Sequence, residues 1–139
     1  MIEIYDDALA LYKELFEVLG SKRGWLHYDQ TFHAASSIVA NIAEGEGTER
    51  GKQARSAYRW SIARGELFET LAWIDIALIE NMVSLEEVQE LKGKLEKLGD
   101  VLKKSVETID ASQYLKEDDT MERARRETER IMKYAGLHY

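Results

Sequence analysis

The sequence predicts an all-α protein that folds as an up-down-up-down four-helix bundle. Apolar residues recur with the 3.6-residue period of amphipathic helices along most of the 139 residues, and the chain contains no proline. Glycine is therefore the main residue left to interrupt helices, and glycine-containing stretches separate the periodic segments. We expect the four helices within residues 1–111 and a charged C-terminal extension in residues 112–139.

The first two helices are expected at about 5–19 and 25–44. In the first helix, Ala8, Leu11, Leu15 and Val18 share one stripe, and Gly20 follows where a helix C-cap commonly has glycine. The second helix is rich in alanine and serine, which let a neighbouring helix approach closely. Residues 45–51 contain three glycines and form the clearest break in the chain.

The third helix, at about 52–81, is apolar on two faces. One stripe consists of Ala54, Tyr58, Ser61, Gly65, Phe68, Ala72, Ile76 and Ile79. The other consists of Trp60, Leu67, Leu71, Ile74 and Leu78. A helix with two apolar faces is buried on two sides, and a large apolar patch left in water is rare in monomers. We therefore predict that the Trp60 stripe is a self-association surface in a homo-oligomer.

The fourth helix has the strongest start signal. Ser84-Leu85-Glu86-Glu87 has the form of a capping box, and Val83 is placed to pack against Val88. The stripe that follows is narrow, which predicts an outer helix running to about residue 110; it consists of Val88, Leu91, Leu95, Leu98, Leu102 and Ile109. Within the extension, Asp119 and Glu122 favour the start of a short fifth helix.

Composition restricts the class of protein. The formal net charge is −7, which disfavours non-specific binding to nucleic acid, and the absence of cysteine excludes disulfides and thiolate metal sites. The acidic N-terminus lacks the basic start of a signal peptide, and no apolar run approaches the roughly 20 residues of a membrane span. We expect a cytoplasmic protein that does not enter a membrane.

Motifs for catalysis or metal binding do not occur at useful spacing. No histidine follows a carboxylate residue by three positions, as in di-metal bundles, and His27 and His33 are six residues apart. Residues 45–51 lack the Gly-Lys-Ser/Thr ending of a phosphate loop. We expect no enzymatic activity, no cofactor and no metal.

Two groups of polar residues are candidate sites. Asn41, Glu44 and Glu69 are interpreted as a structural polar motif, because an unpaired polar group beside core residues costs about 1–3 kcal/mol. A basic cluster without any acidic residue consists of Arg50, Lys52, Arg55, Arg59 and Arg64. It can contact RNA phosphates, or it can pair with the acidic first helix of the same or a neighbouring subunit. The net charge favours the second interpretation.

One string of residues resembles a known family. Ser36-Ser37-Ile38-Val39-Ala40-Asn41-Ile42-Ala43-Glu44-Gly45 looks like the hallmark of the 23S rRNA intervening-sequence proteins, which are related to the accessory variability-determinant proteins of diversity-generating retroelements. The next helix agrees through its basic start and through Tyr58, Ile62-Ala63, Gly65 and Glu69. The resemblance covers about residues 6–109. Val39 stands where many members have proline, the chain is acidic where the retroelement proteins are basic, and the extension is longer than the family pattern.

The resemblance implies a four-helix bundle that assembles as a homopentamer and binds RNA or a reverse transcriptase. Combined with the residue patterns, it leads to two functional hypotheses. The first is a non-enzymatic, self-assembling binding or scaffold protein that uses the Trp60 stripe for self-contact and the basic cluster for an anionic partner. The alternative is an RNA-binding or reverse-transcriptase-associated accessory protein, whose RNA affinity would fall steeply with salt.

Overall fold

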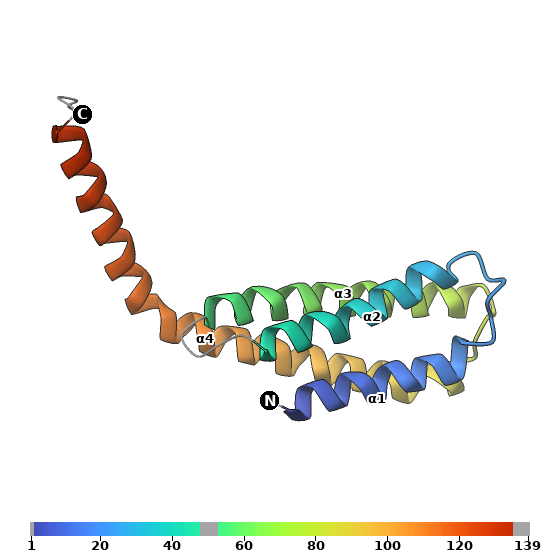
Figure 1. Ribbon diagram of the computed structural model, residues 1–139. Helices are drawn as coiled ribbons and strands as arrows, with labels where there is room; N and C mark the ends of the chain where they lie inside the picture. The colour runs from blue at the N-terminus through green and yellow to red at the C-terminus, as the bar shows by residue number, and fades with distance from the viewer. Residues whose placement is uncertain (1, 48–52, 135–139) are drawn as a thin grey trace.

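Over the residues that it describes, the computed structural model has four helices (Figure 1). They are α1 (Ile2–Leu19), α2 (Tyr28–Glu46), α3 (Gln53–Ile79) and α4 (Leu85–Tyr134). The structure describes the backbone of residues 2–47 and 53–134, and the side chains of residues 4–47, 56–109 and 124–133 within them. The α2–α3 connection at 48–52 therefore lies outside the described residues.

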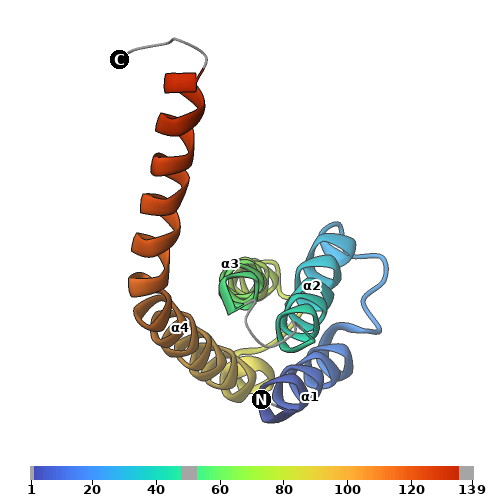
Figure 2. The same ribbon diagram turned by 60° about the vertical axis from the view of Figure 1, so that its left-hand side comes forward.

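The helices are arranged around the bundle in chain order (Figure 2). α1 packs against α2 and α4, and α3 packs against α2 and α4, whereas the two diagonal pairs are not in contact over the described residues. The α2–α3 contact is the most extensive and the α1–α4 contact the least. This is the up-down-up-down bundle that the sequence predicts.

All four helices contribute to one core. Leu19, Ile42, Ile74 and Leu102, one from each helix, have no exposed surface. Burying a side chain of this kind contributes about 1.5–3 kcal/mol each. Trp60 is the largest of the described side chains that are almost completely buried, with 1% of its surface exposed. The core thus runs the length of the bundle and leaves the outer faces available for other contacts.

Both ends of the α3–α4 connection are capped. Asn81 adopts the left-handed conformation with φ of 60°, and its N–H donates to the Leu78 carbonyl while the Met82 N–H donates to Ala77. The predicted capping box is confirmed at Ser84. The Glu87 N–H donates to Ser84 Oγ at 3.2 Å, and the Ser84 N–H donates to Glu87 Oε1 at 2.9 Å.

α2 begins three residues later than the sequence predicts. Residues 25–27 form turns, and the buried Trp25 anchors this connection because its indole Nε1 donates to Glu80 Oε2 at 3.0 Å. His27 lies beside the same carboxylate at 3.7 Å and stacks on Trp73, with ring centroids 4.9 Å apart. Side-chain contacts with the end of α3 therefore fix the start of α2, and helical periodicity alone does not reveal them.

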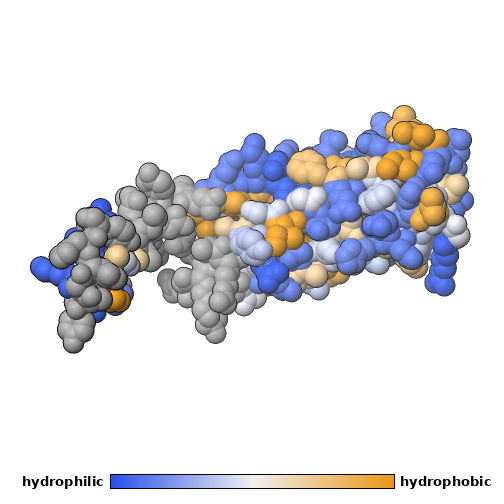
Figure 3. Space-filling view, turned by 90° about the horizontal axis from the view of Figure 1, so that it is seen from above, coloured by the Kyte–Doolittle hydropathy of each residue, from blue (hydrophilic) through white to orange (hydrophobic). Residues whose placement is uncertain are grey.

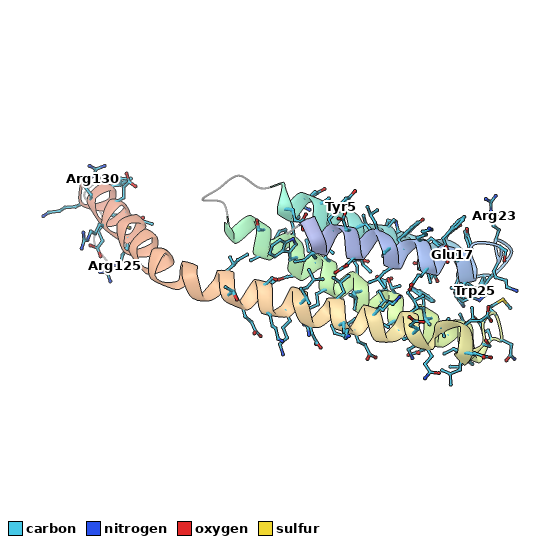
Figure 4. All side chains as sticks on the ribbon, turned by 90° about the horizontal axis from the view of Figure 1, so that it is seen from below. Tyr5, Glu17, Arg23, Trp25, Arg125 and Arg130 are labelled. Atoms are coloured by element: carbon cyan, nitrogen blue, oxygen red, sulfur yellow. The ribbon has the colours of Figure 1, made fainter. Side chains whose placement is uncertain are left out.

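The C-terminal extension is helical, as expected, but it continues α4 without a break. α4 has 50 residues against 27 in α3, and its terminal part bends and projects away from the bundle (Figure 1). Arg125 and Arg130 lie on this projecting part, remote from the bundle (Figure 4). The expected fifth helix is thus the end of α4.

Candidate interaction surfaces

The end of the family-like string is a close contact between α2 and α3. Gly45 is buried inside α2, and a Cβ atom added to it would lie 2.3 Å from Nε1 of Trp60. Trp60 Nε1 donates to the Ile42 carbonyl at 3.4 Å, and Ser56 Oγ donates to the Gly45 carbonyl at 2.8 Å. The sequence predicts that α2 ends before Gly45, and this prediction is wrong. Gly45 lies inside α2, where it makes room for the Trp60 indole, and the helix continues to Glu46.

The predicted polar motif does not come together as one network. Asn41 Nδ2 donates within α2 to the Ser37 carbonyl at 2.9 Å, and Glu44 Oε2 pairs with Arg59 Nε at 3.0 Å. Glu69 is exposed and accepts a hydrogen bond from Trp73 Nε1 at 3.3 Å. The expectation that Glu69 lies among core neighbours is wrong, because the Phe68 beside it is itself on the outer side of α3.

A carboxyl group that sequence reasoning missed lies one turn before Glu69. Glu66 is half-buried, and burial raises the pKa of its carboxyl group. A hydrogen bond to Glu69 and the charge of that residue raise this pKa further, while the charge of His33 on α2 opposes the shift. A signal was present in the three-residue spacing of the two acids, which places them on the same side of a helix.

The basic cluster is divided between two sides of α3. Arg59 faces α2 through its ion pair with Glu44. Arg64 packs over the Phe68 ring, 4.9 Å from its centroid, and helps line the groove with α4. Arg50 and Lys52 lie outside the described residues, as does the side chain of Arg55. The described arginines thus do not form one basic face.

The Trp60 stripe is not a surface. Trp60, Leu67 and Ile74 are at most 1% exposed and belong to the core, and the half-buried Leu71 and Leu78 pack against it. The prediction that this stripe mediates self-association is wrong, because it faces the other three helices. The stripe that includes Tyr58 and Phe68 is the outward one, with these rings 61% and 49% exposed.

The outward side of α3 forms an apolar surface together with α4. Ser61, Gly65 and Phe68 line a groove of about 340 Å³ with Val106 of α4, and charged side chains border it. We call this surface the α3–α4 face; it consists of Tyr58, Ser61, Gly65, Phe68, Ala72 and Val106. The view onto α2 and α3 shows apolar groups exposed among polar ones (Figure 3). Small residues between two exposed rings leave room for another helix.

A second apolar surface lies between α1 and α2. Leu9 and Phe16 are 42% and 49% exposed, and the Phe16 ring packs edge-on against Phe32 of α2. A groove of about 290 Å³ opens beside them. We call this surface the α1–α2 face; it consists of Tyr5, Leu9, Tyr12, Phe16, Val39, Ala40 and Ala43. It lies on the opposite side of the bundle from the α3–α4 face (Figure 2).

Comparison with known proteins identifies the family. The model of the 23S rRNA-intervening sequence protein family matches residues 1–104. The chain belongs to this family. A crystal structure of a protein of unknown function from the S23 ribosomal protein family of Bacteroides thetaiotaomicron is 20% identical, with a TM-score of 0.65. The alignment covers 74% of this chain and 97% of that chain. No curated protein matches.

In this family member, the residues that resemble the family hallmark have a defined place in the structure. Residues 36–45 form the C-terminal part of α2, and their last glycine accommodates Trp60. The family match ends at residue 104, inside α4, so residues 105–139 lie beyond it. Among the described residues, no group of acidic or histidine side chains is arranged to hold a metal ion, and no helix is long and apolar enough to cross a membrane.

Proposed function

We propose that this protein is a non-enzymatic scaffold that assembles by packing its α3–α4 face on the α1–α2 face of the next copy. The observation that carries the proposal is the presence of two exposed apolar faces on opposite sides of one bundle. Single exposed apolar residues are ordinary, but grouped ones commonly mark interaction sites.

The two faces differ in shape, which favours a ring. The α3–α4 face has the small residues Ser61 and Gly65 between exposed rings, whereas the α1–α2 face projects Leu9 and Phe16. A contact between two different surfaces is head-to-tail, and such contacts close into a ring when the rotation between copies permits. The family resemblance implies a ring of five copies, and the assembled ring would present the remaining surfaces to a partner.

The test uses one charged substitution on each face. We expect the wild-type protein to sediment as a closed oligomer, and Leu9→Asp and Phe68→Asp each to sediment as a 16.0 kDa monomer. Each variant keeps one intact face, so mixing them should give a heterodimer with a single junction. Leu26→Asp is the matched control, because Leu26 is 82% exposed in the α1–α2 connection and outside both faces.

The outcomes separate the alternatives. A wild-type monomer at tens of micromolar, where stable interfaces of standard size are occupied, would refute the assembly. Oligomers that resist both substitutions would refute the assigned faces, and variants that fail to form a heterodimer would refute the head-to-tail contact. Circular dichroism checks that each variant keeps its helices.

RNA binding is the second candidate function, and it depends on the basic residues at the start of α3. The Arg59–Glu44 ion pair favours a role within the bundle for that arginine. If the cluster instead binds RNA, Arg55→Gln with Arg59→Gln should reduce the slope of log affinity against log salt by about one for each phosphate that the variant no longer neutralises. RNA binding at physiological salt that this double variant abolishes, with the oligomer intact, would establish the alternative.

A further inference from the structure

Two buried polar atoms in the part of the chain that the structure describes have no hydrogen-bond partner, and they belong to side chains of opposite charge. They are Oε1 of Glu46 and Nε of Arg64. Folded proteins pair nearly all of their buried polar atoms, so each exception needs an explanation. Both residues are half-buried, so part of each side chain also reaches the surface. A group from outside the chain can therefore pair with each of them.

Each of these two atoms lies at one of the two apolar faces. Glu46 lies at the end of the α1–α2 face, because it follows Ala43 by three positions on α2 and its carboxylate accepts a hydrogen bond from the backbone N–H of Tyr5. Arg64 lines the groove of the α3–α4 face, where its guanidinium group packs over the Phe68 ring. One face thus carries an unpaired acceptor on an acid, and the other face carries an unpaired donor on a base.

Contacts between antiparallel helices give the height of Arg64 along the bundle. Asp75 of α3 forms an ion pair with Lys92 of α4, so these two residues are level. Eleven positions before the first of them is Arg64, and eleven positions after the second is Lys103. Equal numbers of residues span equal lengths of α-helix, so Arg64 is level with Lys103. Both residues line the groove of the α3–α4 face, in agreement with this height.

The height of Glu46 follows in the same way through α1. Glu14 of α1 forms an ion pair with Lys94 of α4, so these residues are level. Nine positions before the first of them is Tyr5, and nine positions after the second is again Lys103. Tyr5 is therefore level with Lys103. Because Glu46 contacts Tyr5, the acid and the arginine lie at one height on the two opposite faces of the bundle.

We infer that Arg64 of one copy pairs with Glu46 of the next copy, and that this ion pair fixes the register of the head-to-tail contact. The inference rests on the assembly proposed above. Rotation about the axis of a closed ring leaves the height of every residue unchanged, so groups at one height meet across the junction when the bundles stand parallel to that axis. An arginine that pairs with a carboxylate satisfies the donor and the acceptor together.

The ion pair supplies a specificity that apolar packing lacks. Apolar stripes repeat at every helical turn, so two of them can slip by one turn, about 5.4 Å, and still bury apolar surface. A slipped register leaves both charges unpaired in a contact that excludes water, which is strongly unfavourable. Nearby charges are less suited to this role, because Lys103 has Glu107 beside it in the same groove and Asp6 is exposed to water.

A charge exchange at a single junction tests the pair. In the heterodimer of the Leu9→Asp and Phe68→Asp chains, the one junction brings Arg64 of the first chain to Glu46 of the second. Arg64→Glu in the first chain, or Glu46→Arg in the second, should raise the Kd of the heterodimer about tenfold or more, because like charges then meet. Both exchanges together should restore most of the affinity, since the opposite-charge pair is re-formed with the signs exchanged. Isothermal titration calorimetry measures each Kd.

The same substitutions in the opposite chains are the matched control. Arg64→Glu in the Phe68→Asp chain and Glu46→Arg in the Leu9→Asp chain then lie on the faces outside the junction, and we expect the Kd to stay unchanged. Equal effects in both placements, or a double exchange that binds no more tightly than the single ones, would overturn the ion pair while the assembly stands. If the two chains form no heterodimer before any exchange, the assembly and the ion pair are both refuted.

Discussion

The α2–α3 and α1–α4 contacts are built from different side chains. Small buried residues are frequent on α2 and α3, where Gly45, Ala34, Ala57 and Ala63 let the two helices approach closely. The α1–α4 contact is less extensive and leaves an open groove bordered by Glu14 and Lys94, while larger residues such as leucine make up most of the buried positions of both helices. Close packing makes the first contact intolerant of added volume, whereas the second can adjust.

The largest expected effect comes from adding one methyl group to the close contact. We expect Gly45→Ala to lower the free energy of unfolding by about 1–3 kcal/mol, because the new Cβ would overlap the Trp60 indole. Urea denaturation monitored by tryptophan fluorescence measures the change. Gly93→Ala is the matched control: its Cβ would meet nothing within 4 Å, so α4 should gain about 0.5–1 kcal/mol. Equal effects at both positions would show that overlap with the Trp60 indole is not the cause.

An intermediate effect concerns the half-buried Glu66 on α3. Its pKa is raised above the ordinary 4.5 by burial, so the folded state binds this proton more tightly than the unfolded state does. The contribution of this group to stability therefore increases as the pH falls from the raised pKa toward 4.5, and at neutral pH its charge is destabilising. We expect Glu66→Gln to unfold at a higher temperature than the wild type at pH 7.

This advantage of Glu66→Gln should shrink as the pH falls and vanish below 4.5, where the wild-type carboxyl group is protonated in both states. Thermal unfolding of both proteins across this range measures the difference. Glu96→Gln, at an exposed position on α4, provides the comparison and should show no such trend. A constant difference between Glu66→Gln and wild type at every pH would exclude titration of Glu66 as the cause.

The smallest effect is expected at the ion pair that spans α1 and α4. Lys94 Nζ lies 2.5 Å from Glu14 Oε1, and both side chains are partly exposed. Exposed pairs are screened by salt, so Lys94→Met should lower the unfolding temperature slightly at low ionic strength and leave it unchanged in 1 M salt, where the Debye length is about 3 Å. Lys97→Met, which removes a cation from the same groove without breaking an ion pair, should have no effect even at low salt.

Local signals predicted the helices well. The capping box at Ser84 depends on residues three apart, and the end of α1 at Leu19 depends on the glycine that follows it, so neither requires knowledge of the fold. For α3, the sequence predicts the wrong stripe as the outer one. Both stripes repeat with the helical period, and only the neighbouring helices decide which of them is buried. Ser61 and Gly65 in the outward stripe were an available signal, since they supply little apolar volume to a core.

Other features depended on contacts between distant residues. The sequence predicts a helix end at Gly45 because glycine usually interrupts helices, and only the position of Trp60 explains a buried glycine inside α2. The same limit applies to the basic cluster. Arg59 and Arg64 are close in the sequence, but α2 and α4 lie on different sides of α3 and divide them. Sequence spacing gives the position on a helix, whereas the packing gives the partner.

The close α2–α3 contact also has a consequence for the order in which the bundle forms. Its hydrogen bonds join residues only 11 and 18 positions apart, whereas the Glu14–Lys94 pair joins residues 80 positions apart. Closing a short loop costs less entropy than closing a long one, and contacts that are local in sequence accelerate folding. We therefore expect the α2–α3 hairpin to form before the α1–α4 contact closes the bundle. Substitutions at Gly45 would then slow folding, whereas substitutions at the α1–α4 contact would mainly accelerate unfolding.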